Sequence, residues 1–334
     1  MSRPIGVLGA GAFGTALAIQ LSRRGTPTLL WARDPAFAET VERERENKRY
    51  LPGVPLPAKL RVSADLAQVV AEAGDLLIST PSPALRETCE KLASLIRPDQ
   101  GVVTACKGLE PGWGRFAHEV VREELGAERP LAAISGPTFA HELGMGLPTA
   151  MTVASEDQAF AARIAEALHG DGFRAYTSDD IVGVGIGGAA KNVLAIAVGI
   201  ADGMGLGANT RAAMITRGLT EIGRLCEALG AQPETLMGMA GLGDLVLTCT
   251  DNQSRNRRFG LLLGQGRTPE QAQAEIASVV EGVRAAPEVL RLARKYKVEM
   301  PLCEHVSAVL AGKLSPAQAL KRLAERPLRA ELGD

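Results

Sequence analysis

Two lysines occur at positions in the sequence that are not typical of a solvent-exposed lysine side chain. Lys107 directly follows an apolar strand-like run and precedes a glycine, a position from which its side chain can enter a crevice. Taken alone, Lys107 would be interpreted as an ordinary loop lysine, but a second lysine accompanies it. Lys191, followed by Asn192, interrupts an apolar helical stretch rich in small residues, so it must either reach the surface or serve a polar cavity. Burial and a neighbouring cation lower the pKa of a lysine. Such a lysine can accept a proton from a hydroxyl, or donate one to a carbonyl, near neutral pH.

A carboxylate and a basic segment follow these lysines in the sequence. Asp244 comes after a Gly-Leu-Gly turn and could orient a lysine ammonium through a charge-assisted hydrogen bond, although capping a helix is the alternative. Ser254 is typical of a residue that caps the start of a helix. It is followed by Arg255, Arg257 and Arg258. Arginines near the positive end of a helix suit a phosphate group, and a solvated basic turn is the alternative.

A Gly-x-Gly-x-x-Gly motif, made by Gly9, Gly11 and Gly14, connects an apolar strand pattern at 5–8 to a helical pattern at 15–22. In this setting the first glycine permits a tight turn and the second permits close approach of a pyrophosphate. The third permits close packing of the helix on the strand, and the free N–H groups at the helix start then face the anion. The motif therefore predicts a dinucleotide site.

The elements that must position these residues fall into two groups. Strand-like runs occupy residues 5–8, 28–32, 75–80, 101–105, 131–135 and 149–153, with helical patterns such as 83–95 and 115–125 between them. This alternation predicts an α/β, Rossmann-type doubly wound sheet, mostly parallel. From about Gly187 onward the patterns are helical. We expect a dinucleotide-binding domain at 1–183 and an all-α substrate and dimerisation domain at 184–334, with the site at the carboxyl ends of the strands.

Composition excludes several classes of function. The 334 residues carry a net charge of −1, which gives no general attraction to nucleic acid or to an anionic membrane. The five cysteines form no C-x-x-C pair, so we expect neither a metal site nor disulfides, and a cytoplasmic location. The most apolar run, 193–201, is about half of the roughly 20 residues that a membrane span needs. His118 and His169 are expected at exposed helix positions.

Taken in order, several motifs together resemble one family. They occupy residues 9–18 (GAGAFGTALA), 31–34 (WARD), 50–53 (YLPG), 106–110 (CKGLE), 135–140 (SGPTFA), 190–193 (AKNV), 241–244 (GLGD) and 254–257 (SRNR). Over nearly its full length the chain resembles the bacterial NAD(P)-dependent glycerol-3-phosphate dehydrogenases. The resemblance implies NADP(H) or NAD(H) as cofactor and hydride transfer to or from dihydroxyacetone phosphate. It also implies a supply of sn-glycerol 3-phosphate for phospholipid synthesis, and a homodimer.

The resemblance also implies roles for individual residues. Lys191 would be the catalytic proton acceptor, and Lys107 would touch both substrate and nicotinamide. The substrate-binding residues would be Lys107, Gly136, Thr138, Lys191, Asp244, Ser254, Arg255 and Asn256. The cofactor-binding residues would be Gly9, Gly11, Ala12, Phe13, Gly14, Arg33, Lys107, Ala140, Arg255, Val279 and Glu281. No metal ligand is implied.

The choice of cofactor depends on the end of the second predicted strand. NAD-selective sites place an acidic residue about 20 residues beyond the glycines, where it binds the ribose hydroxyls. Here Arg33 comes first, with Asp34 beside it. Because Arg33 could bind a 2′-phosphate, we predict that NADPH is used at least as well as NADH.

Two other functions are compatible with parts of the sequence. A related two-domain dehydrogenase acting on another hydroxy acid, such as a 6-phosphogluconate or ketopantoate enzyme, would need a carboxylate-binding site in place of the cluster at Arg255. A nucleotide sensor without catalytic activity would keep the glycines but tolerate loss of Lys107, Lys191 and Asp244. All three are present, which counts against a sensor.

Overall fold

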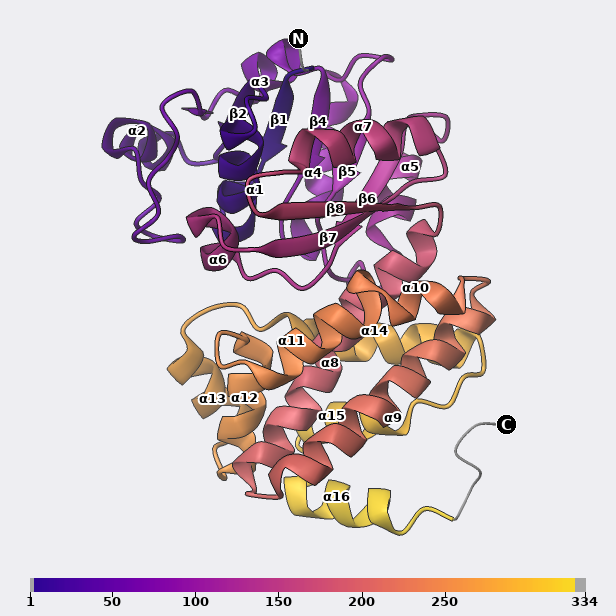
Figure 1. Cartoon of the computed structure of the whole chain (residues 1–334). Coiled ribbons are helices and arrows are strands. Elements are labelled where there is room, and N and C mark those ends of the chain that lie inside the picture. Colours follow the sequence, from indigo (N-terminus) through magenta and orange to yellow (C-terminus); the bar gives the residue numbers. More distant parts are fainter. Residues whose placement is uncertain (1–2, 328–334) are drawn as a thin grey trace.

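An eight-stranded sheet forms the first half of the protein in the computed structural model, which describes residues 3–327 (Figure 1). Its strands are β1 (Ile5–Leu8), β2 (Thr28–Trp31), β3 (Arg61–Ser63), β4 (Asp75–Ile78), β5 (Val102–Thr104), β6 (Leu131–Ser135), β7 (Thr149–Ala154) and β8 (Phe173–Ser178). The order across the sheet is β3-β2-β1-β4-β5-β6-β7-β8, and every neighbouring pair is parallel except β6 with β7. This confirms the predicted doubly wound, mostly parallel architecture.

Two strands, β3 and β8, were absent from the sequence prediction. Both lie at the edges of the sheet, where one side of the strand has no partner strand. β3 has only three residues, and most side chains of β8 are exposed or half-buried. Neither therefore has the continuous apolar run that marks a buried parallel strand.

Helices cover both faces of the sheet. They are α1 (Ala12–Arg23), α2 (Pro35–Glu44), α3 (Leu66–Glu72), α4 (Leu85–Ala93), α5 (Ala117–Leu125), α6 (Ala140–Met145) and α7 (Gln158–Leu168), with a 3-10 turn at Ser82–Ala84. One hydrophobic cluster joins the sheet to α1, α2, α6 and α7, and another joins its other face to α3, α4 and α5. The loops at the carboxyl ends of the central strands lie between these layers and the helical half.

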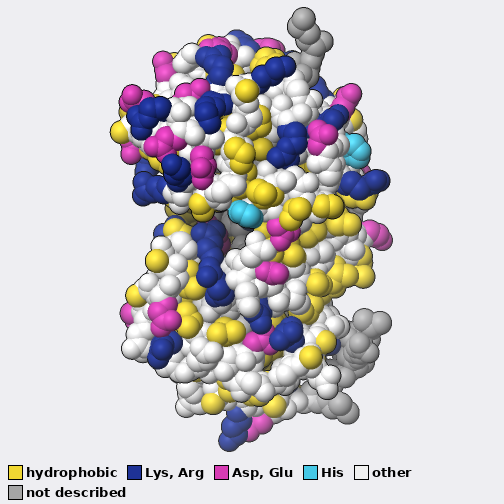
Figure 2. Space-filling model, turned by 60° about the vertical axis from the view of Figure 1, so that its left-hand side comes forward, with side chains coloured by type: hydrophobic (Ala, Val, Ile, Leu, Met, Phe, Trp, Pro, Cys, Tyr) yellow, Lys and Arg dark blue, Asp and Glu magenta, His cyan; other side chains and the backbone are white. Residues whose placement is uncertain are grey.

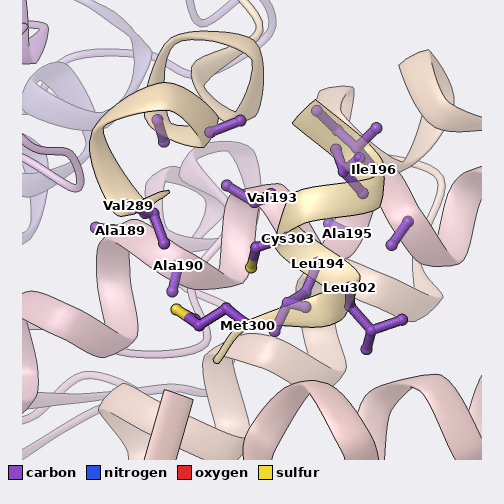
Figure 3. Close-up of a cluster of buried hydrophobic side chains, with 14 of the residues drawn as sticks. Ala189, Ala190, Val193, Leu194, Ala195, Ile196, Val289, Met300, Leu302 and Cys303 are labelled. Atoms are coloured by element: carbon purple, nitrogen blue, oxygen red, sulfur yellow. The ribbon is translucent and has the colours of Figure 1, made fainter. Parts of the chain in front are cut away.

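The second half of the protein is built around one long helix, α8 (Ile181–Gly203). The helices after it are α9 (Gly207–Ala228), α10 (Pro233–Met237), α11 (Asp244–Thr250), α12 (Arg255–Gly264), α13 (Pro269–Ile276), α14 (Glu281–Lys295), α15 (Pro301–Leu310) and α16 (Pro316–Ala324), with a π-helical turn at Met239–Gly243 before α11. Figure 3 shows Val193 and Leu194 of α8 among side chains of the surrounding helices, including Val289 and Leu302. The division at residues 183 and 184 stays a prediction, supported by this change from sheet to helices.

α8 extends well beyond the most apolar run of the sequence, 193–201. By length and mean hydropathy it could cross a membrane, but 89% of its most apolar window is buried inside the protein. The helices around it account for that burial. α8 is therefore the core helix of the second half, and Lys191 is one of the few charged side chains inside it.

The crossing of α8 over α12 is unusually close because glycines line it. A Cβ on Gly199 would lie 2.1 Å from the carbonyl oxygen of Arg257. A Cβ on Gly260 would lie 2.1 Å from the carbonyl oxygen of Ile196. No side chain larger than hydrogen fits at these positions, so the two backbones are in direct contact. This contact fixes the start of α12 relative to Lys191.

His118 contradicts its predicted exposure. It lies in α5 with 4% of its surface exposed, and its ring stacks on Phe116 at a centroid distance of 5.4 Å. Burial lowers the pKa of His118 to about 4. The ring is therefore part of the core under α5. His169, which follows the last residue of α7, is exposed as expected.

Candidate active site

The glycine motif between β1 and α1 has the geometry that the sequence predicts. Gly9 has φ +119°, and a Cβ there would lie 2.6 Å from the carbonyl oxygen of Ser79. A Cβ on Gly14 would lie 2.0 Å from the carbonyl oxygen of Gly9, so close packing of helix on strand requires glycine. Around the Cβ position of Gly11, by contrast, no other part of the described chain (residues 3–327) comes within 4 Å, apart from the residues next to it in sequence. The backbone at Gly11 is thus open to a pyrophosphate, and the loop fits a dinucleotide.

Asp244 is the centre of the site beyond this loop. Its side chain is almost fully buried and receives two ammonium groups: Lys191 Nζ contacts Oδ1, and Lys107 Nζ lies 3.0 Å from Oδ2. The hydroxyl of Ser135, at the end of β6, also donates to Oδ2 at 3.3 Å. The expectation that Asp244 orients a lysine is therefore confirmed. The carboxylate joins α11, α8 and the loop after β5 in one place.

The charged groups in this centre shift one another's pKa values. Burial is the largest influence on Lys191 and lowers its pKa; Lys107 lowers it further, while Asp244 raises it, and the result is a pKa of about 8. Burial opposes ionisation of Asp244, but the two ammonium groups outweigh it and hold the pKa of the carboxyl below its ordinary value. Lys191 can therefore exist in either protonation state near neutral pH, as the sequence predicted.

Thr248 belongs to this centre, and the sequence prediction gave it no role. Lys191 Nζ donates to Thr248 Oγ1 at 3.0 Å, and that hydroxyl donates to the backbone carbonyl of Asp244 at 2.6 Å. The only signal in the sequence is that Thr248 lies four residues after Asp244, which puts both on one helix face. Lys191 thus has two fixed acceptors, which leaves one of its three N–H directions for a substrate.

A chain of amides ties the lysines to the neighbouring helices. Asn192 donates to the carbonyl of Lys107 at 3.3 Å and accepts from Asn256 at 2.9 Å. Asn256 Oδ1 in turn accepts from the backbone N–H of Gly282 at 2.8 Å. The starts of α12 and α14 are therefore held at a fixed place beside α8.

The basic segment is only partly as expected. Ser254 Oγ accepts from the backbone N–H of Arg257 at 3.2 Å, so the predicted cap of α12 is confirmed. Arg257 does not face the site: it is buried and paired with Asp202 at 2.6 Å. Arg255 and Arg258 are exposed. The expected set of three arginines at an anion site is thus wrong for Arg257, and exposure alone does not place Arg258 there.

The remaining predicted residues lie around the same crevice or at its cofactor side. The carbonyl of Gly136 accepts from Lys107 Nζ at 3.2 Å, and Phe13 places its ring centroid 5.2 Å from that ammonium. Thr138 Oγ1 is buried and has no hydrogen-bond partner among residues 3–327. Such a buried hydroxyl indicates a ligand, because leaving it unpaired is costly.

The other predicted cofactor-binding residues lie outside the lysine centre. Ala12 and Ala140 are the first residues of α1 and α6, and Arg33 is exposed after β2. Burial raises the pKa of Glu281, while Arg255 and Arg284 oppose this rise. A Cβ on Gly108 would lie 3.8 Å from Glu281 Oε2, so Glu281 faces the loop of Lys107. Its neighbour Val279 is 37% exposed, on the segment that leads into α14.

The site combines a lysine that can transfer a proton with a neighbouring helix start that can bind an anion. A dry lysine with a pKa of about 8 lies beside a second lysine, while the start of α12 supplies free N–H groups and Arg255. Figure 2 shows the surface hollowed where the two halves meet, with Lys and Arg side chains on its rim. Within residues 3–327, no group of three or more His, Cys, Asp or Glu side chains could hold a metal ion. The arrangement suits a hydroxyl or ketone group on a phosphorylated substrate.

Comparison with known proteins places the chain in one family. The family model for the NAD-dependent glycerol-3-phosphate dehydrogenase N-terminus matches residues 4–161, and that for the C-terminus matches residues 180–321. The chain is 55% identical over 330 residues to "Glycerol-3-phosphate dehydrogenase [NAD(P)+]" of Stenotrophomonas maltophilia, covering 99% of this chain and 97% of that one. It is 54% identical over 327 residues to the protein of the same name from Xanthomonas euvesicatoria, covering 98% and 96%.

Solved structures agree with this assignment. The crystal structure of glycerol-3-phosphate dehydrogenase from Coxiella burnetii superposes with a TM-score of 0.93 at 47% identity, covering 97% of this chain and 99% of that chain. A ketopantoate reductase from Ralstonia solanacearum, described as putative, reaches a TM-score of 0.63 at 16% identity, covering 94% and 98%. The second likeness shows a shared fold alone.

Proposed function

The chain belongs to the NAD-dependent glycerol-3-phosphate dehydrogenase family, and we propose from this premise that it interconverts dihydroxyacetone phosphate and sn-glycerol 3-phosphate. The single observation that carries the chemistry is the buried Lys191, with a pKa of about 8, held against Asp244. The open backbone at Gly11 supports binding of a dinucleotide beside it. Bound NAD(P)H supplies the hydride that the ketone carbon receives.

Lys191 handles the proton. In ketone reduction its ammonium donates a proton to the oxygen that becomes the hydroxyl; in the reverse direction its neutral amine accepts that proton. Asp244 and Thr248 fix the direction in which the remaining N–H points. Lys107 adds a second positive charge that stabilises the negative charge developing on the same oxygen. Lys191 is buried, and electrostatic interactions are stronger there than in water.

The substrate phosphate would bind at the start of α12. Ser254 satisfies one N–H group there, and the other free N–H groups of this turn, together with Arg255, present positive charge to an anion. Thr138, in the loop after β6, contributes a buried hydroxyl that has no partner among the described residues. The phosphate would thus be bound by the helical half while the lysines hold the oxygen that reacts.

We propose that NADPH is used at least as well as NADH, with Arg33 on the 2′-phosphate. The geometry of Asp34 supports this choice, because its Oδ1 accepts from the backbone N–H of Ala36 at 3.0 Å as the cap of α2. The neighbouring acidic side chain is therefore engaged in capping. Arg33→Gln should lower kcat/KM for NADPH and leave that for NADH nearly unchanged, measured as initial rates with each cofactor. An equal loss with both would contradict this role.

The proposed activity is tested by following NADPH oxidation on addition of dihydroxyacetone phosphate. Lys191→Met should lower kcat by about 10²–10⁴-fold, the usual contribution of a positioned acid or base. The exposed Lys313 provides the matched control, Lys313→Met, which should retain full activity. A kcat near wild type in Lys191→Met would show that another group transfers the proton.

A second assay tests the phosphate site. Arg255→Gln should raise KM for dihydroxyacetone phosphate sharply, whereas Arg258→Gln, an exposed arginine of the same helix, should not. Replacing dihydroxyacetone phosphate by 2-ketopantoate should give little turnover. Preference for 2-ketopantoate would favour the ketopantoate-enzyme alternative instead.

We further propose a cytoplasmic homodimer that supplies sn-glycerol 3-phosphate for phospholipid synthesis. The membership of the family supports this role, and the small exposed residues of α9, such as Ala212 and Ala213, are compatible with contact between two copies. Light scattering during gel filtration tests the dimer: a mass of one chain at micromolar concentration would overturn it.

A further inference from the structure

A second hollow, with a volume of about 330 Å³, lies away from the lysine centre. One wall is the loop before α5, with Trp113 and Arg115, and the other is the end of α14, with Arg291, Lys295 and Tyr296. Phe116, Leu229 and Leu292 contribute apolar lining. The volume lies at the lower end of the usual range for small-molecule sites. Both halves of the protein thus contribute walls to this hollow.

Trp113 stands out on the first wall because 66% of its surface is exposed. The other tryptophan, Trp31, is buried and donates its indole N–H to the carbonyl of Ala64 at 3.0 Å. Trp113 instead carries the Arg115 guanidinium 4.8 Å from its ring centroid. The loop itself is tied down, since Gly112 N–H donates to the carboxylate of Glu288 at 2.9 Å. A large exposed ring on a fixed loop is a surface on which another flat ring can stack.

The charges on the rim favour an anion. The residues that line the hollow include three cations, Arg115, Arg291 and Lys295, and one carboxylate, Glu119. Glu119 already accepts from the backbone N–H of Phe116 at 2.7 Å. Arg291 pairs with Glu288 through Nε at 3.2 Å, which leaves its terminal nitrogens. Lys295 lies 5.3 Å from the ring centroid of Tyr296 and forms no ion pair with the residues described. Arg115 pairs with Glu123, so Lys295 and Arg291 are the cations best able to meet a ligand.

We propose that this hollow binds a nucleoside monophosphate, with the base on the Trp113 ring and the phosphate on Arg291 and Lys295. Aromatic rings with adjacent cations bind bases through stacking, and Arg and Lys bind phosphate through charge-assisted hydrogen bonds. Because the two walls belong to different halves of the protein, a bound nucleotide favours the arrangement that brings them together. The site is separate from the dinucleotide loop at Gly9–Gly14 and does not depend on the proposed reaction.

The test is titration with GMP under saturating NADP⁺, followed by tryptophan fluorescence and by equilibrium dialysis. We expect saturable binding and a fluorescence change that Trp113→Phe abolishes. The double variant Arg291→Gln/Lys295→Gln should weaken GMP binding about tenfold or more, which corresponds to about 1.4 kcal/mol. The matched variant Arg294→Gln/Lys313→Gln removes the same charge at exposed positions outside the hollow and should bind GMP normally.

Three results would overturn the proposal. One is absence of saturable binding, and another is equal GMP affinity in the two double variants. The third is displacement of GMP by inorganic phosphate at the concentration of GMP itself, which would show an anion site that does not recognise the base. Both double variants should retain wild-type NADPH oxidation without GMP, which verifies that they fold.

Discussion

The pH dependence of ketone reduction should follow the protonation of Lys191. With a pKa of about 8, Lys191 is protonated below that pH and can donate; above it, kcat/KM for reduction should fall about tenfold per pH unit. Oxidation needs the neutral amine, so its kcat/KM should rise through the same pH. Lys191→Met should remove this limb from whatever activity remains.

The two charged neighbours of Lys191 should move this limb in opposite directions. Asp244 raises the pKa of Lys191, so Asp244→Asn should shift the limb to lower pH; Lys107 lowers that pKa, so Lys107→Met should shift it to higher pH. Two unit charges 4 Å apart interact by about 4 kcal/mol at an effective dielectric constant near 20. One pKa unit is worth about 1.4 kcal/mol. Since Lys191 contacts Asp244 directly, we expect a downward shift of more than one unit in Asp244→Asn.

The assay is the initial rate of NADPH oxidation at subsaturating dihydroxyacetone phosphate, from about pH 6 to about pH 10, two units on either side of the limb. Thermal unfolding of each variant serves as the control, because removing one partner of a buried pair costs about 3–5 kcal/mol. Displacement of the limb in the same direction by Asp244→Asn and Lys107→Met would refute the reasoning. If the pH dependence persists in Lys191→Met, it arises from the titration of another group.

Three further predictions concern residues other than those that control the proposed proton transfer. Gly11→Ala should keep the melting temperature but raise KM for NADPH, whereas Gly14→Ala should lower the melting temperature, because its methyl group would lie 2.0 Å from a carbonyl oxygen; the reverse order would contradict this geometry. Asp202→Asn, which breaks the pairs with Arg257 and Arg211, should lower the free energy of unfolding by about 3–5 kcal/mol and raise KM for dihydroxyacetone phosphate more than KM for NADPH; equal rises would contradict a role in placing α12. The pKa of His118 is about 4 in the folded protein and about 6.5 when unfolded, so the unfolded state gains the proton first and stability falls as pH drops below about 6.5. Urea unfolding should show a loss of about 2 kcal/mol between pH 7 and pH 5 that His118→Gln removes, and an equal loss in the variant would contradict the assignment.

The buried position of Lys191 could be predicted because of its surroundings in the sequence. A charge inside an apolar helix is costly unless it is paired, so Lys191 stood out from solvated lysines, and Asp244 was the matching carboxylate. Thr248 was missed because a threonine in a helix is compatible with many ordinary structural roles. Only the fold shows that its hydroxyl lies 3.0 Å from Lys191 Nζ.

The two edge strands, β3 and β8, could not be predicted from residue type. A buried parallel strand has to be apolar on both faces, which is what identified β1, β4 and β6. The side chains of β8 are mostly polar or small because the strand lies at the edge of the sheet. Its pairing with β7 depends on backbone hydrogen bonds, and these leave no mark on residue type.

In α12, the spacing of the glycines in the sequence distinguishes an inward-facing arginine from an outward-facing one. Gly260 and Gly264 lie four residues apart and face α8, where only glycine fits. Arg257 lies three residues before Gly260 and seven before Gly264, so helical periodicity puts it on the same inward face. It therefore meets Asp202 inside the protein, whereas Arg255 is turned outward. The glycine spacing thus assigns Arg257 to the contact between helices and leaves Arg255 exposed, as the proposed phosphate site requires.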